Sequence, residues 1–95
     1  MSTKQLAAKY ISSAEKVLET LTRTQTPVTV NEATVSEVLR WAADYLADAK
    51  YYKAQGKLGT SLTSVAYCEG LLDGLRLMGA VNFVWSTKQQ TESKE

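Results

Sequence analysis

Two apolar patterns of helical spacing meet at Gly56, and this pair of patterns most constrains what the chain can fold into. Before Gly56, apolar side chains recur at three- and four-residue steps, the spacing of one buried helix face. After it, a second apolar stretch runs to Gly79, and glycine readily takes the positive φ that ends a helix. Because the connection is so short, the two helices are expected to lie side by side and antiparallel. The face before Gly56 comprises Val35, Val38, Leu39, Ala42, Tyr45, Leu46, Ala49 and Tyr52.

A third helix is expected ahead of this hairpin, over residues 3–22. Ser2 followed by Gln5 fits a capping box, in which the two side chains satisfy free backbone donors at a helix start. The helix would then carry one apolar face, which we call the N-terminal seam. The seam consists of Ala7, Tyr10, Ile11, Ala14, Val17, Leu18 and Leu21.

Between the first two helices, residues 23–33 are mostly polar and include Pro27, so they are predicted to form a long loop. Thr34 and Glu37 make a second capping box that would start the middle helix. The predicted fold class is therefore all-α. It is an antiparallel three-helix bundle with helices at about 3–22, 34–55 and 58–78.

The chain divides into one domain, 1–85, and a tail, 86–95. The tail is polar and has no periodicity, so it is expected to be disordered. Just before it, Phe83, Val84 and Trp85 are large apolar residues that something must cover, either the flank of the bundle or a second copy. These three residues are the candidate interaction surface.

The last helix is apolar around most of its circumference, which favours burial against both other helices, with surface left over for an oligomer. Ala66, Gly70 and Gly74 form a stripe of small residues at four-residue spacing. Since glycine inside a helix costs about 1 kcal/mol relative to alanine, the stripe predicts close approach by another element.

Composition excludes several classes of function. The net charge of +1 gives no global attraction to nucleic acid or to an anionic membrane. The absence of histidine excludes histidine-based catalysis and histidine-containing zinc sites within this chain. The lone Cys68 is expected to be a small core residue in a reducing cytoplasm, since no base is available to activate it and no signal-peptide pattern is seen. The apolar runs are too short to span a membrane.

Acidic residues on the two hairpin helices suggest an alternative, a small-ligand or divalent-metal site. Asp48 on one helix and Glu69 with Asp73 on the other could face each other and supply oxygen ligands to magnesium or calcium. The candidate ligand site is Asp48, Tyr67, Glu69 and Asp73. Solvation, or pairing of Asp73 with Arg76 one turn on, is the favoured interpretation of these carboxylates, so no metal or cofactor is assigned.

Lysines and tyrosines gather near the hairpin turn, a combination that single-stranded nucleic acid favours. Three lysines are few, however, and the helix dipole accounts for two of them, so nucleic-acid binding is not expected. The residues are Lys50, Tyr51, Tyr52, Lys53 and Lys57. The remaining large aromatic residues of the hairpin are expected to be core or groove walls. These are Trp41, Tyr45, Tyr52 and Tyr67.

A set of hairpin residues follows a recognisable order: Tyr45, Asp48, Ala49, Lys50, Tyr52 and Gly56, then Ala66, Tyr67, Gly70, Leu72, Asp73 and Gly79. In this order the chain resembles the archaeal domain-of-unknown-function family 357. The resemblance implies a small cytoplasmic three-helix bundle, and it implies no activity, because the family has none assigned. Cys68, Glu69 and Gly74 depart from the residues most often found in that family.

The sequence thus favours a non-enzymatic protein that acts as a protein–protein interaction or assembly module, with a homodimer or a second protein as the partner. The small-ligand or metal-binding bundle is the alternative.

Overall fold

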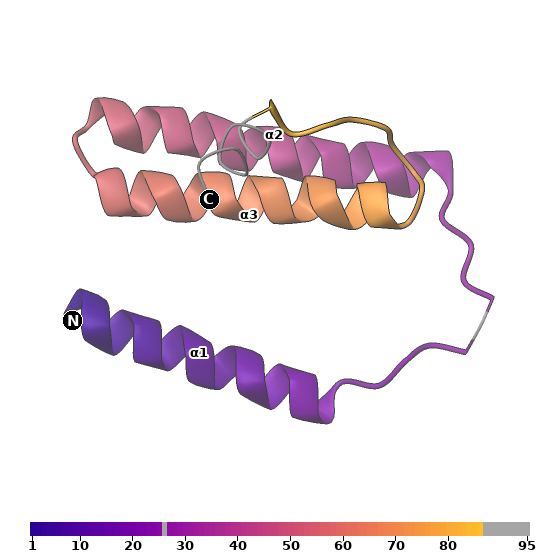
Figure 1. Cartoon of the computed structure of the whole chain (residues 1–95), viewed down its shortest axis with the longest axis horizontal. Helices are drawn as coiled ribbons and strands as arrows, with labels where there is room; N and C mark the ends of the chain where they lie inside the picture. The colour runs from indigo at the N-terminus through magenta and orange to yellow at the C-terminus, as the bar shows by residue number, and fades with distance from the viewer. Residues whose placement is uncertain (26, 87–95) are drawn as a thin grey trace.

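The computed structural model describes residues 1–25 and 27–86. Three helices make up this part of the chain, and no strand occurs in it. They are α1 (Thr3–Thr20), α2 (Glu32–Ala54) and α3 (Leu58–Leu77), as Figure 1 shows. The all-α fold class is confirmed, with each predicted helix boundary within two residues of the observed one. The predicted disordered tail, 86–95, lies outside the described residues except for Ser86.

Of the two capping boxes predicted from the sequence, one is present and one is not. The capping box at Ser2 is confirmed. The backbone N–H of Gln5 donates to the Ser2 hydroxyl oxygen over 3.1 Å, and the backbone N–H of Ser2 donates to the Gln5 side-chain oxygen over 2.8 Å. The second predicted capping box is wrong. Asn31 caps α2 instead, because its side-chain oxygen already accepts the Thr34 N–H at 2.9 Å and starts the helix two residues earlier.

Both hairpin helices end as their glycines predict. Gly56 and Gly79 have φ of +76° and +79°, the left-handed conformation that glycine adopts without strain. At each end the N–H of the residue after the glycine donates back to a carbonyl five residues earlier, from Lys57 to Tyr52 and from Ala80 to Leu75. This hydrogen-bond pattern satisfies the last free carbonyls and fixes the direction in which the chain leaves the helix.

Helices α2 and α3 pack antiparallel, and their contact contains all the buried residues of the described chain. These residues are Ala42, Ala49, Cys68 and Leu75, each at most 5% exposed. Three of the four have short side chains, which allows the two helices to approach closely. Near the turn, the Ser61 hydroxyl donates across the interface to the Ala49 carbonyl oxygen over 2.7 Å. The hairpin is therefore held by a narrow apolar contact and one interhelical hydrogen bond.

Helix α1 lies apart from this hairpin (Figure 1). None of its residues is buried, and it makes no packing contact with α2 or α3. The expectation that α3 packs against both other helices is thus wrong, since α2 is the only one of the two that contacts α3. Periodicity predicts which face of α1 needs burial, but it does not determine which surface covers that face, and the seam is exposed.

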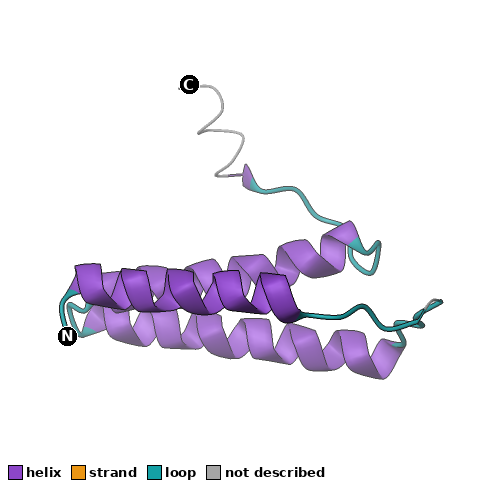
Figure 2. Cartoon of the chain, turned by 90° about the horizontal axis from the view of Figure 1, so that it is seen from below, coloured by secondary structure: helices purple, strands orange, loops and turns teal. Residues whose placement is uncertain are grey.

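After α3 the chain reverses direction. The segment from Ala80 to Trp85 leaves the end of α3 as an extended loop (Figures 1 and 2) and brings its aromatic residues back to the flank of the same helix.

We predict that Ser61→Ala lowers the free energy of unfolding by about 1 kcal/mol, because a part-buried carbonyl loses its interhelical donor. Chemical denaturation followed by circular dichroism measures this change. Thr63→Ala is the matched control, since the Thr63 hydroxyl donates only to Gly59 of its own helix at an exposed position. Equal effects of the two substitutions would show that the hydrogen bond between the helices contributes nothing.

Candidate protein-binding surfaces

The N-terminal seam of α1 is the first apolar surface without a partner in the described chain. Its large side chains are all exposed: Tyr10 63%, Ile11 60%, Val17 56%, Leu18 74% and Leu21 52%. The seam was predicted as the face of one bundle helix, and its residues do fall on one side of α1. Neither α2 nor α3 packs against it.

A second apolar surface lies on the hairpin, where aromatic residues of α2 and α3 meet. The rings of Tyr45 and Tyr67 stack with centroids 4.3 Å apart and planes 25° apart. Trp41 and Tyr45 border a shallow hollow of about 310 Å³, together with Asp44 and Asp48. A second hollow, of about 260 Å³, is lined by Tyr67, Gly70 and Leu71. We call Trp41, Tyr45, Tyr67, Gly70 and Leu71 the aromatic face.

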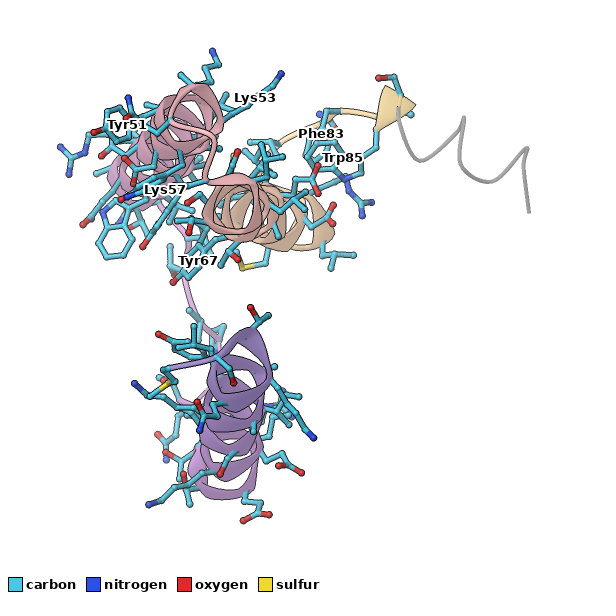
Figure 3. All side chains as sticks on the ribbon, turned by 90° about the vertical axis from the view of Figure 1, so that its left-hand side faces the viewer. Tyr51, Lys53, Lys57, Tyr67, Phe83 and Trp85 are labelled. Atoms are coloured by element: carbon cyan, nitrogen blue, oxygen red, sulfur yellow. The ribbon has the colours of Figure 1, made fainter. Side chains whose placement is uncertain are left out.

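The aromatic face is open rather than covered. Trp41 is 48% exposed and Tyr67 is 50% exposed. Figure 3 shows Tyr67 on the side of the hairpin that is turned toward α1. These aromatic residues were expected to be core or groove walls, and Tyr45 with Tyr67 forms such a wall, between two hollows.

The small-residue stripe of α3 borders the same face. A side-chain carbon added at Gly70 or Gly74 would meet no atom within 4 Å. The predicted close approach of another element therefore does not occur within residues 1–25 and 27–86. The physical reason is that α3 turns Cys68 and Leu75, not the glycines, toward α2.

The candidate interaction residues Phe83, Val84 and Trp85 divide into two groups. Phe83 and Trp85 contact each other edge to face at 4.8 Å and are half-buried. The Trp85 indole N–H donates to the Asp73 carboxylate over 2.7 Å, and the Arg76 guanidinium lies 5.8 Å from the Phe83 ring centre. Val84 stays 73% exposed. The flank of α3 thus covers two of the three residues.

The residues of the alternative ligand site point to separate environments. Asp48 borders the Trp41 hollow, whereas Asp73 pairs with Arg76 at 3.3 Å and accepts the Trp85 hydrogen bond. Figure 3 shows Tyr67 and Trp85 on different sides of α3. Glu69 is exposed. Within residues 1–25 and 27–86, no three or more histidine, cysteine or acidic side chains gather in a way that could hold a metal ion.

The lysines and tyrosines near the turn do not form one surface. Tyr51 and Tyr52 contact each other edge to face at 5.3 Å. Lys53, however, points to the other side of α2 from Tyr51 (Figure 3). Tyr51 and Lys53 therefore do not lie on one surface of α2.

The thiol of Cys68 lies in the hairpin core and is 5% exposed, as predicted. Burial raises its pKa above the ordinary value of 9.0, and the nearby charge of Glu69 raises it further. The thiolate, which is the reactive form, is therefore disfavoured at neutral pH.

Together these features define an all-α protein with a tightly packed helical hairpin and a detached amphipathic helix. Residues 9–81 match the model of a family described as protein of unknown function, DUF357. The match covers most of the chain, so this protein belongs to that family. No curated protein and no solved structure matches it. None of the described helices combines the length and hydrophobicity needed to cross a membrane.

We predict that Asp73→Ala releases Trp85 from the flank of α3, because the indole loses its acceptor. In a Trp41→Phe background, which leaves Trp85 as the reporter, its emission should shift to the red and its quenching by acrylamide should increase. Asp44→Ala is the control, since Asp44 lies on α2 and borders the hollow beside Trp41, not the Trp85 site. Unchanged quenching in the Asp73 variant would contradict this arrangement.

We also predict that Cys68 reacts with iodoacetamide far more slowly in the native protein than in urea at the same pH. Its raised pKa lowers the thiolate fraction at any pH below that value, and burial blocks the reagent. Mass spectrometry of the alkylated protein over time measures the rate. Native and unfolded rates that agree within a factor of two would show that the thiol is accessible.

Proposed function

We propose that this chain is a non-enzymatic protein–protein interaction or assembly module whose working surfaces are the N-terminal seam and the aromatic face. One observation carries the proposal: α1 is an amphipathic helix with no buried residue. The setting we propose is the cytoplasm, where a lone thiol such as Cys68 stays reduced.

Helix α1 needs a partner to be stable. Helices of this size gain most of their stability from packing an amphipathic face, and without packing they are only marginally stable in water. The 18 residues of α1 receive no such packing from α2 or α3. Burial of one large side chain such as Ile11 or Leu18 contributes about 1.5–3 kcal/mol. A partner that covers the seam would therefore stabilise α1 substantially.

The family match covers most of both surfaces. It begins inside α1, at residue 9, and ends beyond α3, at residue 81. The aromatic face and all of the seam except Ala7 thus lie within the matched residues. The segment with Phe83 and Trp85 is the weaker candidate, because both side chains already pack on α3.

Substitution in the seam tests this function. We expect Leu18→Glu to abolish the complex that the wild-type protein forms, with itself or with another protein, because a charge is placed in the middle of the apolar contact. Ser12→Glu is the matched control, since Ser12 lies on the polar side of α1. Sedimentation velocity and native mass spectrometry measure the complex.

Circular dichroism should show that the α2–α3 hairpin remains folded in both variants. Equal association by the Leu18 and Ser12 variants, or a wild-type protein with no partner at all, would refute the proposed function.

A further inference from the structure

The aromatic face has two hollows of different chemistry, separated by the stack of Tyr45 on Tyr67. The first hollow is bordered by two carboxylates, Asp44 and Asp48, whereas the second is apolar. Resting on the function proposed above, we infer that the aromatic face binds a segment of a different protein. That segment presents an arginine to the first hollow and an apolar side chain to the second.

The first hollow brings together the two kinds of group that bind an organic cation. Its lining residues recur over two turns of α2 at positions that share one face of the helix. They are Trp41, Asp44, Tyr45 and Asp48. Aromatic rings attract a cation over their faces, and carboxylates attract it by charge and by hydrogen bonding. The cation–ring contacts of the described residues lie elsewhere, on α1 and at the flank of α3, so these rings have no cation of their own.

The carboxylates of this hollow are not neutralised within the described chain. Neither Asp44 nor Asp48 forms an ion pair with a described residue. Arg40, one turn before Asp44, borders a separate hollow together with Glu37. Carboxylates four residues apart on a helix repel each other, and a cation bound between them would remove that repulsion. The first hollow is therefore complementary to a positive charge.

Arginine meets the requirements of this hollow better than lysine does. Its guanidinium group is planar, stacks on aromatic rings and donates paired hydrogen bonds to carboxylates. It is also more weakly hydrated than an ammonium group, so it loses less when it leaves water for the surface of the rings.

The second hollow suits an apolar side chain. It is lined by Tyr67, Gly70 and Leu71 and holds about 260 Å³. A side-chain carbon added at Gly70 would meet no atom within 4 Å, so a partner can approach the backbone of α3 there. A segment that lies across the tyrosine stack therefore fits when it carries one basic and one apolar side chain on the same face.

Other kinds of partner fit this surface less well. Both hollows are shallow and open, whereas a pocket for a small molecule encloses most of its ligand. Asp44 and Asp48 would repel the phosphates of nucleic acid and of anionic lipids. A second copy that packed its seam here would bring little positive charge, because Lys9 and Lys16 lie on the far side of α1 from the seam and Lys4 lies in the first turn.

A designed peptide tests this recognition. The probe is a helical peptide in which leucine and arginine alternate along one face at three- and four-residue steps, so that it offers the pair in either order. A matched peptide carries citrulline, which has the shape of arginine without its charge. The chain has two tryptophans, so NMR gives two indole N–H signals. The Trp41 signal reports on the first hollow, and the Trp85 signal is the internal control, because this indole is bonded to Asp73.

Two pairs of substitutions separate specific recognition from general attraction between charges. Asp44→Asn with Asp48→Asn removes the carboxylates of the hollow and keeps the shape of their side chains. Glu15→Gln with Glu19→Gln is the matched control, since it removes two carboxylates from α1. Each pair removes two negative charges and so raises the net charge of +1 by two, to +3.

We expect titration with the arginine peptide to shift the Trp41 signal and to leave the Trp85 signal in place. The dissociation constant should rise on the order of tenfold in the Asp44 and Asp48 variant, and by a similar factor when wild-type protein is given the citrulline peptide. The Glu15 and Glu19 variant should bind the arginine peptide within a factor of two of wild type.

An unshifted Trp41 signal, or equal binding of the arginine and citrulline peptides, would overturn the inference. Equal weakening in the two pairs of variants would overturn it as well, because the attraction would then be nonspecific. A Trp41 signal that moves when the wild-type protein alone is diluted would overturn a different protein as the partner. The proposed function is judged separately: if Leu18→Glu abolishes a complex while the peptide fails to bind, only the recognition of arginine is refuted.

Discussion

The close contact between α2 and α3 is the interaction on which the rest of the structure depends. It rests on short side chains, above all Ala42, Ala49 and Cys68, which let two helices approach until a serine hydroxyl reaches across to a backbone carbonyl. The left-handed glycine at Gly56 fixes the reversal between them. Because this contact is narrow, it buries only one face of each helix and leaves the aromatic face of the hairpin exposed.

The exposure of the seam and of the aromatic face is explained if the protein works as part of a complex. The hairpin of α2 and α3 forms only a small core. Small cores usually need reinforcement by a metal, disulfides or association. One cysteine and no histidine leave this chain few ways to use the first two. Association through the N-terminal seam would supply the missing burial, and it would turn the most exposed helix into the element that decides whether a complex forms.

The sequence predicted most of the helix boundaries, but it predicted little of how side chains are arranged on the surface. The ends of α2 and α3 could be predicted from Gly56 and Gly79, since the conformation of a glycine is a local property. Asn31 displaced Thr34 as the cap of α2 because two good capping residues lay one turn apart. The stack of Tyr45 on Tyr67 could not be predicted, because it depends on the register between two helices. The seam of α1 was predicted as a face that needs burial, but periodicity does not say which chain covers it.

Hydrogen exchange measured by NMR, residue by residue and at two protein concentrations, tests the central claim most directly. The account predicts that amides of α2 and α3 are protected at both concentrations. Those of α1 should exchange faster than those of the hairpin at the lower concentration, because a helix without packing is only marginally stable. Protection of α1 equal to that of the hairpin and independent of concentration would contradict the account, since α1 would then be packed within its own chain.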